Sequence, residues 1–190
     1  MNSIGRSASS VVILSCSLNP NSQSHKLALA ADGFLRAREV VVELVDLGEH
    51  DLPLCGAPES FDHPSVKTLT RIIDAAGAIL VSSPVYNYDL TAAAKNVMEL
   101  TGKSWADKPV GFLCAAGGTR SYMSPVGFAT SLMLDFRCLI VPRFVYCTKS
   151  DFTEAGEPGP EIRERVEQLA TAAVDLSRAL AWVRANPLHR

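Results

Sequence analysis

The chain has 190 residues, which is the size of one typical domain of about 100–200 residues. Its 18 basic and 20 acidic side chains give a formal net charge of −2 without any run of five like charges, which argues against a nucleic-acid scaffold. At 47% hydrophobic and 20% charged residues, the composition is too apolar for a disordered chain. We expect a single domain over residues 1–190, with residues 1–9 as a flexible N-terminus.

No segment has the length of a signal-peptide core or of a membrane span. The first continuous apolar run covers residues 11–14, whereas a signal core needs about 7–15 residues and a span about 18. The five cysteines contain no CxxC pair, which argues against both a disulfide framework and a zinc site. We therefore expect a cytoplasmic protein with no metal and with no membrane or nucleic-acid partner.

Five continuous apolar runs predict the strands of a parallel sheet, because strands covered on both faces lose the alternation of polar and apolar residues. In chain order, these runs cover residues 11–16, 40–45, 78–81, 110–115 and 138–141. Pro142 follows the last run, and proline removes a backbone donor from a sheet. We expect the fifth strand to lie at the edge of the sheet.

Helical periodicity fills the segments between and after these runs. Apolar residues at helical spacing predict helices near residues 27–35, 66–76, 94–101, 126–134 and 162–183. The first follows Ser22 to Ser24, which can supply an N-cap. Alternation of strands with helices predicts the α/β class, as a three-layer α/β/α sandwich around a five-stranded parallel sheet of order 2-1-3-4-5.

Ligands of such sheets bind beyond the carboxyl ends of the strands, at the switch point between the first and third strands. The first loop at that edge covers residues 15–24 and is rich in hydroxyl and amide side chains ahead of a helix. Those groups, with the free N–H groups and dipole of the helix, suit a phosphate, although helix capping alone accounts for some of them. His25 either faces this phosphate or is solvated. The loop contains no GxGxxG or P-loop pattern.

The second loop, residues 82–90, carries Pro84, Tyr86 and Tyr88 and is expected to end at Asp89 as the N-cap of the next helix. Its flat apolar side chains suit an aromatic ring, or else they anchor the loop or contact another subunit.

The third loop, residues 114–122, contains a Gly-Gly pair. Paired glycines allow the backbone to approach a ligand closely, and they also serve a tight turn.

At these residues the chain resembles the NADPH-dependent FMN reductase family of flavodoxin-like flavoproteins, over about residues 10–180. The first loop of that family has the form G-S-x-R-x-x-S-x-N, and residues 16–24 match it at Ser17 and Ser22, with Asn19 at the Arg position. The P-x-Y-N loop of the family is matched in full over residues 84–87. Lys95 and Asn96 match its downstream Lys-Asn pair.

The resemblance implies a flavodoxin-like, FMN-containing oxidoreductase that moves a hydride from NADPH or NADH to FMN and then to a flavin, a quinone or a similar small acceptor. No catalytic side chain is expected, because flavin N5 carries the hydride. The residues implied at the FMN phosphate are Ser17, Asn19, Ser22, Gln23 and Ser24. Those implied at the isoalloxazine are Pro84, Val85, Tyr86, Asn87, Ala116, Gly117, Gly118 and Thr119.

The resemblance also implies a homodimer or homotetramer with the flavin near an interface. Six large side chains in the second half of the chain are candidates for that interface, and they suit a core equally well: Met98, Trp105, Tyr122, Met123, Phe128 and Met133.

Two other functions fit parts of the sequence. Cys114 and Arg120, followed by Ser121, satisfy the Cys-x5-Arg-Ser/Thr loop of cysteine phosphatases, in which a thiolate attacks phosphorus and the arginine holds the oxyanion. Against this, Cys114 ends an apolar run, where burial raises the pKa of a thiol. The third function is a flavodoxin-like electron carrier without enzymatic activity. Such carriers tend to be strongly acidic, so a net charge of −2 gives that alternative little support.

Overall fold

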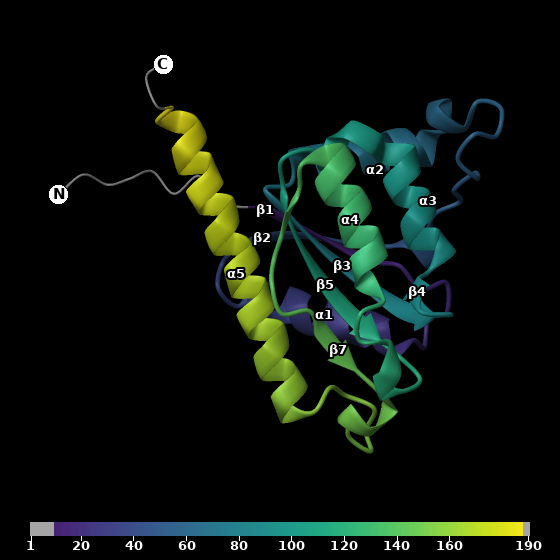
Figure 1. Ribbon diagram of the computed structural model, residues 1–190, viewed down its shortest axis with the longest axis vertical. Helices are drawn as coiled ribbons and strands as arrows, with labels where there is room; N and C mark the ends of the chain where they lie inside the picture. Colours follow the sequence, from purple (N-terminus) through teal and green to yellow (C-terminus); the bar gives the residue numbers. More distant parts are fainter. Residues whose placement is uncertain (1–9, 188–190) are drawn as a thin grey trace.

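A parallel sheet forms the middle layer of the computed structural model, which describes residues 10–187 (Figure 1). Its parallel strands are β1 (Ser10–Ser15), β2 (Val41–Asp46), β3 (Ala78–Tyr86), β5 (Pro109–Ala115), β6 (Leu139–Ile140) and β7 (Val145–Cys147). The order is β2-β1-β3-β5-β6, and β7 also pairs with β5. The predicted order 2-1-3-4-5 is therefore confirmed, with β6 and β7 together as the fifth strand. The expectation for residues 1–9 lies outside the described residues.

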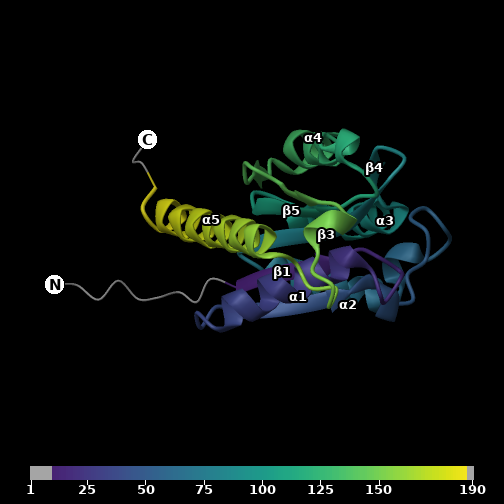
Figure 2. The same ribbon diagram turned by 90° about the horizontal axis from the view of Figure 1, so that it is seen from below.

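Helices cover both faces of this sheet, so the α/β/α sandwich is confirmed (Figures 1 and 2). Side chains of α1 (Gln23–Arg36) and α5 (Pro160–Ala185) pack in the core on one face. The core on the other face contains side chains of α2 (Pro64–Ala75), α3 (Ala92–Thr101) and α4 (Pro125–Phe136). No helix among the described residues is both long enough and apolar enough to cross a membrane.

Local sequence explains where these helices begin. Ser22 N-caps α1, since its Oγ accepts a hydrogen bond of 3.0 Å from the His25 amide. In α2, α4 and α5 a proline occupies the first turn, where no amide hydrogen is required. The five predicted helices are confirmed in place.

Three features differ from the sequence prediction. The fifth strand resumes after Pro142 as β7, because residues 145–147 again pair with β5 at the edge of the sheet. The second loop is shorter than expected, because β3 continues to Tyr86 and forms a hairpin with β4 (Asp89–Leu90). The apolar stripe of α5 is buried only as far as Ser177, and Val183 is exposed where the helix extends beyond the sheet.

Gly111 fixes how closely α5 approaches β5. A Cβ at this position would lie 2.9 Å from Leu80 Cδ2 and 3.2 Å from Leu169 Cγ, so only glycine allows the observed packing. Exposed Gly33 in α1 is the opposite case, since a Cβ there meets nothing within 4 Å.

We expect Gly111→Ala to lower the free energy of unfolding by about 1–3 kcal/mol through overpacking. Gly33→Ala is the matched control, and it should raise the free energy of unfolding by about 0.5–1 kcal/mol because alanine is the better helix former. Urea denaturation followed by circular dichroism measures both. Wild-type stability of Gly111→Ala would contradict the packing of α5 on β5.

Candidate functional site

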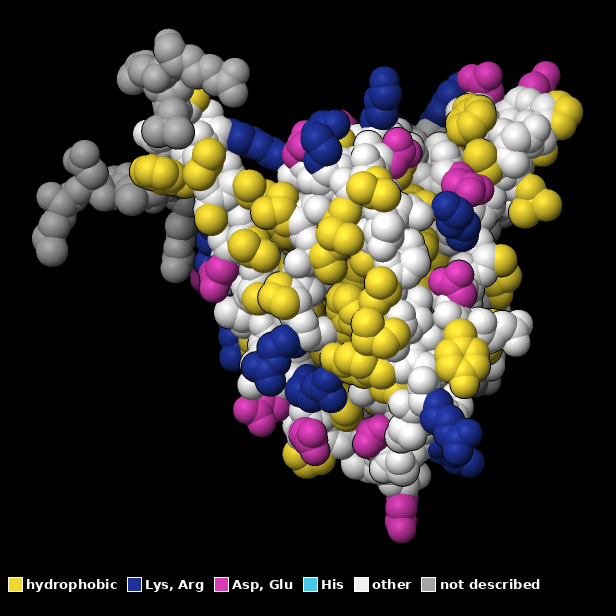
Figure 3. Space-filling model, viewed as in Figure 1, with side chains coloured by type: hydrophobic (Ala, Val, Ile, Leu, Met, Phe, Trp, Pro, Cys, Tyr) yellow, Lys and Arg dark blue, Asp and Glu magenta, His cyan; other side chains and the backbone are white. Residues whose placement is uncertain are grey.

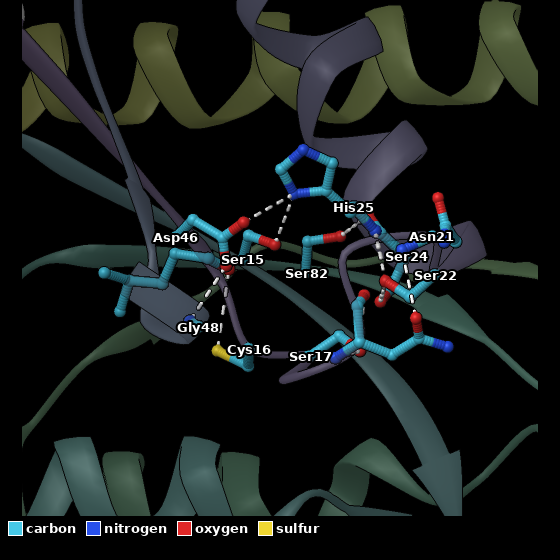
Figure 4. Close-up of polar contacts among 12 residues, drawn as sticks. Ser15, Cys16, Ser17, Asn21, Ser22, Ser24, His25, Asp46, Gly48 and Ser82 are labelled. Carbon is cyan, nitrogen blue, oxygen red and sulfur yellow. Dashed lines mark hydrogen bonds and ion pairs between the residues drawn. The ribbon is translucent and has the colours of Figure 1, made fainter. Parts of the chain in front are cut away.

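The first loop, between β1 and α1, is shaped by its own polar side chains (Figure 4). The Asn19 amide donates to Ser17 Oγ at 3.1 Å, and the Asn21 amide donates to Asn19 Oδ1 at 3.0 Å. The Ser22 amide donates to the Asn19 carbonyl at 3.0 Å, which leads the chain into the N-cap of α1. The loop is thus folded into a fixed turn directly ahead of a helix N-terminus.

The five residues predicted at a phosphate all belong to this turn or to the first turn of α1. Ser17 is buried, Ser22 and Gln23 are half-buried, and Asn19 is exposed. Ser24 is fully buried, with its Oγ 3.1 Å from Ser22 Oγ. The first amides of a helix have no partner within the helix, and the helix dipole favours an anion there. Hydroxyl groups and free amides therefore converge at this end of α1, as a phosphate requires.

His25 has neither of the two positions that the sequence suggested. Its Nδ1 lies 2.9 Å from Ser15 Oγ and 3.3 Å from Asp46 Oδ2, and Figure 4 shows the ring turned toward these two residues. Asp46 Oδ1 in turn accepts a hydrogen bond from the Gly48 amide at 3.0 Å. His25 therefore connects α1 to the carboxyl ends of β1 and β2 rather than facing the phosphate or the solvent.

Buried hydroxyls connect the first loop to the second. The Cys16 amide donates to the Ser82 carbonyl at 2.7 Å, and Thr91 Oγ1 donates to the Cys16 carbonyl at 2.8 Å. Ser82 Oγ donates to the Ser24 carbonyl at 2.6 Å.

The prediction of Asp89 as the N-cap of α3 is wrong. Asp89 belongs to β4, and Thr91 is the N-cap, since its Oγ1 accepts from the Ala94 amide at 3.2 Å. Sequence reasoning missed Thr91 because hydroxyl residues are common in loops.

The second loop is a tight hairpin that projects from the carboxyl end of β3. Pro84 is buried and pairs in register with Ala115 of β5, while Tyr86 pairs with Asp89 across the hairpin. Beyond Pro84 the side chains emerge into solvent, and Tyr86 is 59% exposed. The hairpin therefore presents aromatic surface next to the third loop.

The third loop follows β5 after Ala115, and its two glycines are exposed and uncrowded. Gly117 and Gly118 are exposed, neither has a positive φ, and a Cβ on either would meet nothing within 4 Å. A tight turn does not require them, so their backbone is free to lie against a ligand. Tyr146 of β7 holds the loop, because its hydroxyl donates to the Gly118 carbonyl and lies 2.8 Å from Ser121 Oγ. Tyr146 is a residue that the sequence analysis missed.

The hairpin and the third loop border an open cavity of about 560 Å³. Its lining residues are Val85, Asn87, Tyr88, Gly118, Thr119, Arg120 and Ser121. This volume lies within the range of about 300–1,000 Å³ that is usual for small-molecule sites. The cavity lies at the same edge of the sheet as the N-terminus of α1, although no residue of the first loop lines it. An aromatic wall, an open glycine backbone and a helix end suited to an anion are the features that a flavin nucleotide needs.

Lys95 and Asn96, which match the Lys-Asn pair of the family, do not line this cavity. Asn96 holds the loop before α2 against α3, since its Oδ1 accepts from the Cys55 amide at 2.8 Å and its Nδ2 donates to the Pro53 carbonyl at 2.9 Å. Lys95 Nζ lies 3.4 Å from Glu99 Oε1 on the same helix.

The phosphatase pattern does not form a reactive site. Cys114 is fully buried in β5, and burial is the main cause that raises the pKa of its thiol, followed by the nearby Cys147 and Cys16. The thiol is therefore protonated at neutral pH, and a thiol is a much weaker nucleophile than a thiolate. Arg120 lies on the exposed third loop and lines the cavity.

Comparison with known proteins agrees with this geometry. The model of the NADPH-dependent FMN reductase family matches residues 9–152, which is more than half of the chain. An NAD(P)H-dependent FAD/FMN reductase of Geobacillus thermodenitrificans is 27% identical over 145 residues, covering 75% of this chain and 78% of that protein. An NADPH azoreductase of Bacillus sp. strain OY1-2 is 36% identical over 78 residues, covering 40% of this chain and 44% of that protein.

Among solved structures, FerB, a flavoenzyme NAD(P)H:(acceptor) oxidoreductase from Paracoccus denitrificans, superimposes with a TM-score of 0.74 at 21% identity. The alignment covers 90% of this chain and 98% of that one, which supports the flavodoxin-like fold. Together with the family match over residues 9–152, it shows that the chain belongs to the NADPH-dependent FMN reductase family and is an oxidoreductase of that type.

Proposed function

We propose that this protein binds FMN at the first, second and third loops and uses NAD(P)H to reduce a flavin, a quinone or a similar small acceptor. The observation that carries the proposal is the convergence of two complementary surfaces at one edge of the sheet. One is the hydroxyl-lined N-terminus of α1, and the other is the cavity of about 560 Å³ between the hairpin and the third loop. Both surfaces lie at the edge formed by the carboxyl ends of the parallel strands, because α1 follows β1 while the hairpin and the third loop follow β3 and β5.

Each part of the site has a separate task in this proposal. Ser17 and Ser22, with the first amides of α1, hold the phosphate by neutral hydrogen bonds and the helix dipole. Pro84 to Asn87 would hold the isoalloxazine from the hairpin side, and the Gly117 and Gly118 amides would stabilise the negative charge of a reduced ring. When bound, FMN would supply hydride transfer from NAD(P)H and the delivery of the same two electrons to the acceptor. The protein itself contributes binding and orientation, so no general base is required.

Several observations support the finer parts of this proposal. The similar proteins are named as a reductase of FAD and FMN and as an azoreductase, which are activities on planar aromatic acceptors. Arg120, which lines the cavity, is a suitable partner for the 2′-phosphate of NADPH. All five cysteines are free, and free thiols in this number are typical of the reducing cytoplasm.

A homo-oligomer is also part of the proposal. Of the six interface candidates from the sequence, Met98, Trp105 and Phe128 lie in the core. The other three, Tyr122, Met123 and Met133, are exposed on or just before α4. With Val126 and Leu134, they belong to the apolar surface that Figure 3 shows over this helix. An exposed apolar helix face of this kind is typical of a subunit contact.

The flavin site is tested by titrating FMN fluorescence with protein, followed by anaerobic addition of NADPH or NADH while the absorbance of oxidised flavin at ~450 nm is followed. Asn19→Asp should raise the Kd of FMN at least tenfold, because it places a negative charge beside the phosphate. Asn19→Arg should lower the Kd by supplying a charged donor. Asn19 is exposed, and aspartate keeps the acceptor of the Asn21 amide, so Asn19→Asp preserves the turn. Asn19→Arg removes that acceptor, but Asn21 is also exposed, so water can satisfy its amide.

Ser65→Asp is the matched control, since it adds the same charge at the first turn of α2, away from the cavity. It should leave the Kd of FMN unchanged. Absence of FMN quenching with the wild-type protein would contradict the whole site. Quenching without loss of the flavin band on adding NAD(P)H would instead favour a non-catalytic electron carrier.

The reactivity of the cysteine thiols distinguishes the proposed reductase from the phosphatase alternative. Cys16, Cys114, Cys138 and Cys147 are buried, whereas Cys55 is partly exposed. Burial raises the pKa of Cys138 to about 11 and that of Cys147 to about 12. At pH 8, an aromatic disulfide reagent should therefore modify one thiol quickly in the native protein and all five after denaturation.

Cys55→Ser should remove that fast phase, and Cys114→Ser should leave it unchanged. A fast phase that disappears in Cys114→Ser, together with phosphatase activity blocked by iodoacetamide, would restore the phosphatase alternative.

The oligomer is tested at Leu134, which is 81% exposed on α4. Wild-type protein should have at least twice the chain mass of 20.4 kDa by light scattering after size-exclusion chromatography. Leu134→Asp should return it to 20.4 kDa, because a charge in an apolar contact must be desolvated. Val183→Asp, an equivalent change on exposed α5, is the control that keeps the wild-type mass. A monomeric wild-type protein would rule out the contact.

A further inference from the structure

The turn of the hairpin between β3 and β4 has an unusual residue in it. Tyr86 pairs with Asp89, so Asn87 and Tyr88 are the two turn residues, with φ of 53° and 64°. Positive φ at both positions is the requirement of a type I′ turn, for which Asn-Gly is the preferred pair. Asparagine tolerates this conformation, but a bulky side chain does not, so glycine would be more stable than tyrosine at position 88.

Burial of the Tyr88 side chain does not offset this strain. Tyr88 is 69% exposed, which leaves most of its ring outside the core. The neighbouring aromatic pairs connect Tyr122 with Phe144 and with Tyr146, beside the third loop, and do not include Tyr88. An observed strained residue at a cavity points to a function that the strain serves.

The position of the ring indicates what that function is. Tyr88 lines the cavity of about 560 Å³ from the hairpin side, and Gly118 and Thr119 line it from the third loop. The glycine leaves open space on its side of the cavity, since a Cβ there would meet nothing within 4 Å. With the flavin ring of the proposed site against that open backbone, the space left on the Tyr88 side favours a flat acceptor, which can stack on an aromatic ring, over a compact one.

We propose that Tyr88 is a specificity-determining residue, which selects planar aromatic substrates by stacking at the mouth of this cavity. The inference rests on the proposed function and adds the residue that sets which acceptors the same site prefers. For a quinone, the overall reaction balances as NAD(P)H, a proton and the quinone giving NAD(P)⁺ and the hydroquinone. The nicotinamide ring is planar as well, so it is a second source of the same chemistry.

The test compares Tyr88→Gly, Tyr88→Phe and wild type with menadione as a planar acceptor and ferricyanide as a compact one. In Tyr88→Gly, the ratio of kcat/KM for menadione to that for ferricyanide should fall about fivefold to tenfold, the range expected for one aromatic contact. Calorimetric titration of menadione into oxidised, FMN-loaded protein without NADPH should show the same rise in Kd. Tyr88→Phe should retain both wild-type values, because stacking needs the ring and not the hydroxyl.

Stability gives an independent measurement. Tyr88→Gly should shift the urea midpoint of the flavin-free protein upward, since glycine relieves the positive φ. Glu59→Gly is the matched control: Glu59 has φ of 59° and does not line the cavity, so relief of its strain should raise the midpoint without changing the menadione ratio. A changed KM for NADPH together with that for menadione would extend the stacking to the nicotinamide.

Three results would overturn the inference. The first is a menadione Kd and selectivity ratio that do not change in Tyr88→Gly while FMN still binds. The second is a large loss of FMN affinity in that variant, which would place Tyr88 in the flavin site. The third is a lower urea midpoint, which would mean that the ring serves folding. Failure of wild-type protein to bind FMN is a separate outcome, and it would overturn the proposed function together with this inference.

Discussion

At the switch point between β1 and β3, the backbone of Cys16 must find hydrogen-bond partners without water. A buried unpaired amide or carbonyl costs about 1–3 kcal/mol. Only conformations that pair both groups of Cys16 are therefore stable where the chain leaves β1. Here the Cys16 amide bonds the Ser82 carbonyl, and its carbonyl accepts from Thr91. Ser82 Oγ then bonds the Ser24 carbonyl at the start of α1. The first loop, the hairpin and α1 are fixed to one another before any ligand binds, and such preorganisation lowers the entropic cost of binding.

Much of this arrangement follows from patterns that a sequence displays directly. Continuous apolar runs identify strands buried on both faces, and alternation with helices indicates a parallel sheet, for which 2-1-3-4-5 is a common order of five strands. The position of the three loops at one edge then follows from topology alone. The exact ends of the strands cannot be predicted in this way, because short pairings at the edge depend on free backbone groups of the neighbouring strand. Residues 145–147 become β7 only because β5 has free backbone groups opposite them.

The details of the site are harder to predict, since they depend on contacts between residues far apart in sequence. Tyr146 bonds the Gly118 carbonyl from a strand that the apolar runs did not predict. His25 shows the same limit, because its partner Asp46 lies at the end of β2 and only the folded sheet brings them within 3.3 Å. At position 88 the local conformation is the better guide, and the residue departs from it. A type I′ turn favours glycine there, but the chain has Tyr88. Such violations of a local rule are expected where function outweighs stability.

In the proposed FMN site, Asn19 at the position of the family's arginine changes the kind of contact that the turn offers a phosphate. With Asn19 at the position of the family's arginine, the donors at this turn are hydroxyls, amides and the end of the α1 dipole. Neutral donors of this kind depend on position more than on charge, and the bonds from Asn19 to Ser17 and from Asn21 to Asn19 supply that position. The interaction with a phosphate should then be less sensitive to salt than an arginine contact would be, because long-range attraction is what salt screens. In the proposed FMN site, geometry set by the loop's own hydrogen bonds thus takes the place of the arginine charge in anion recognition.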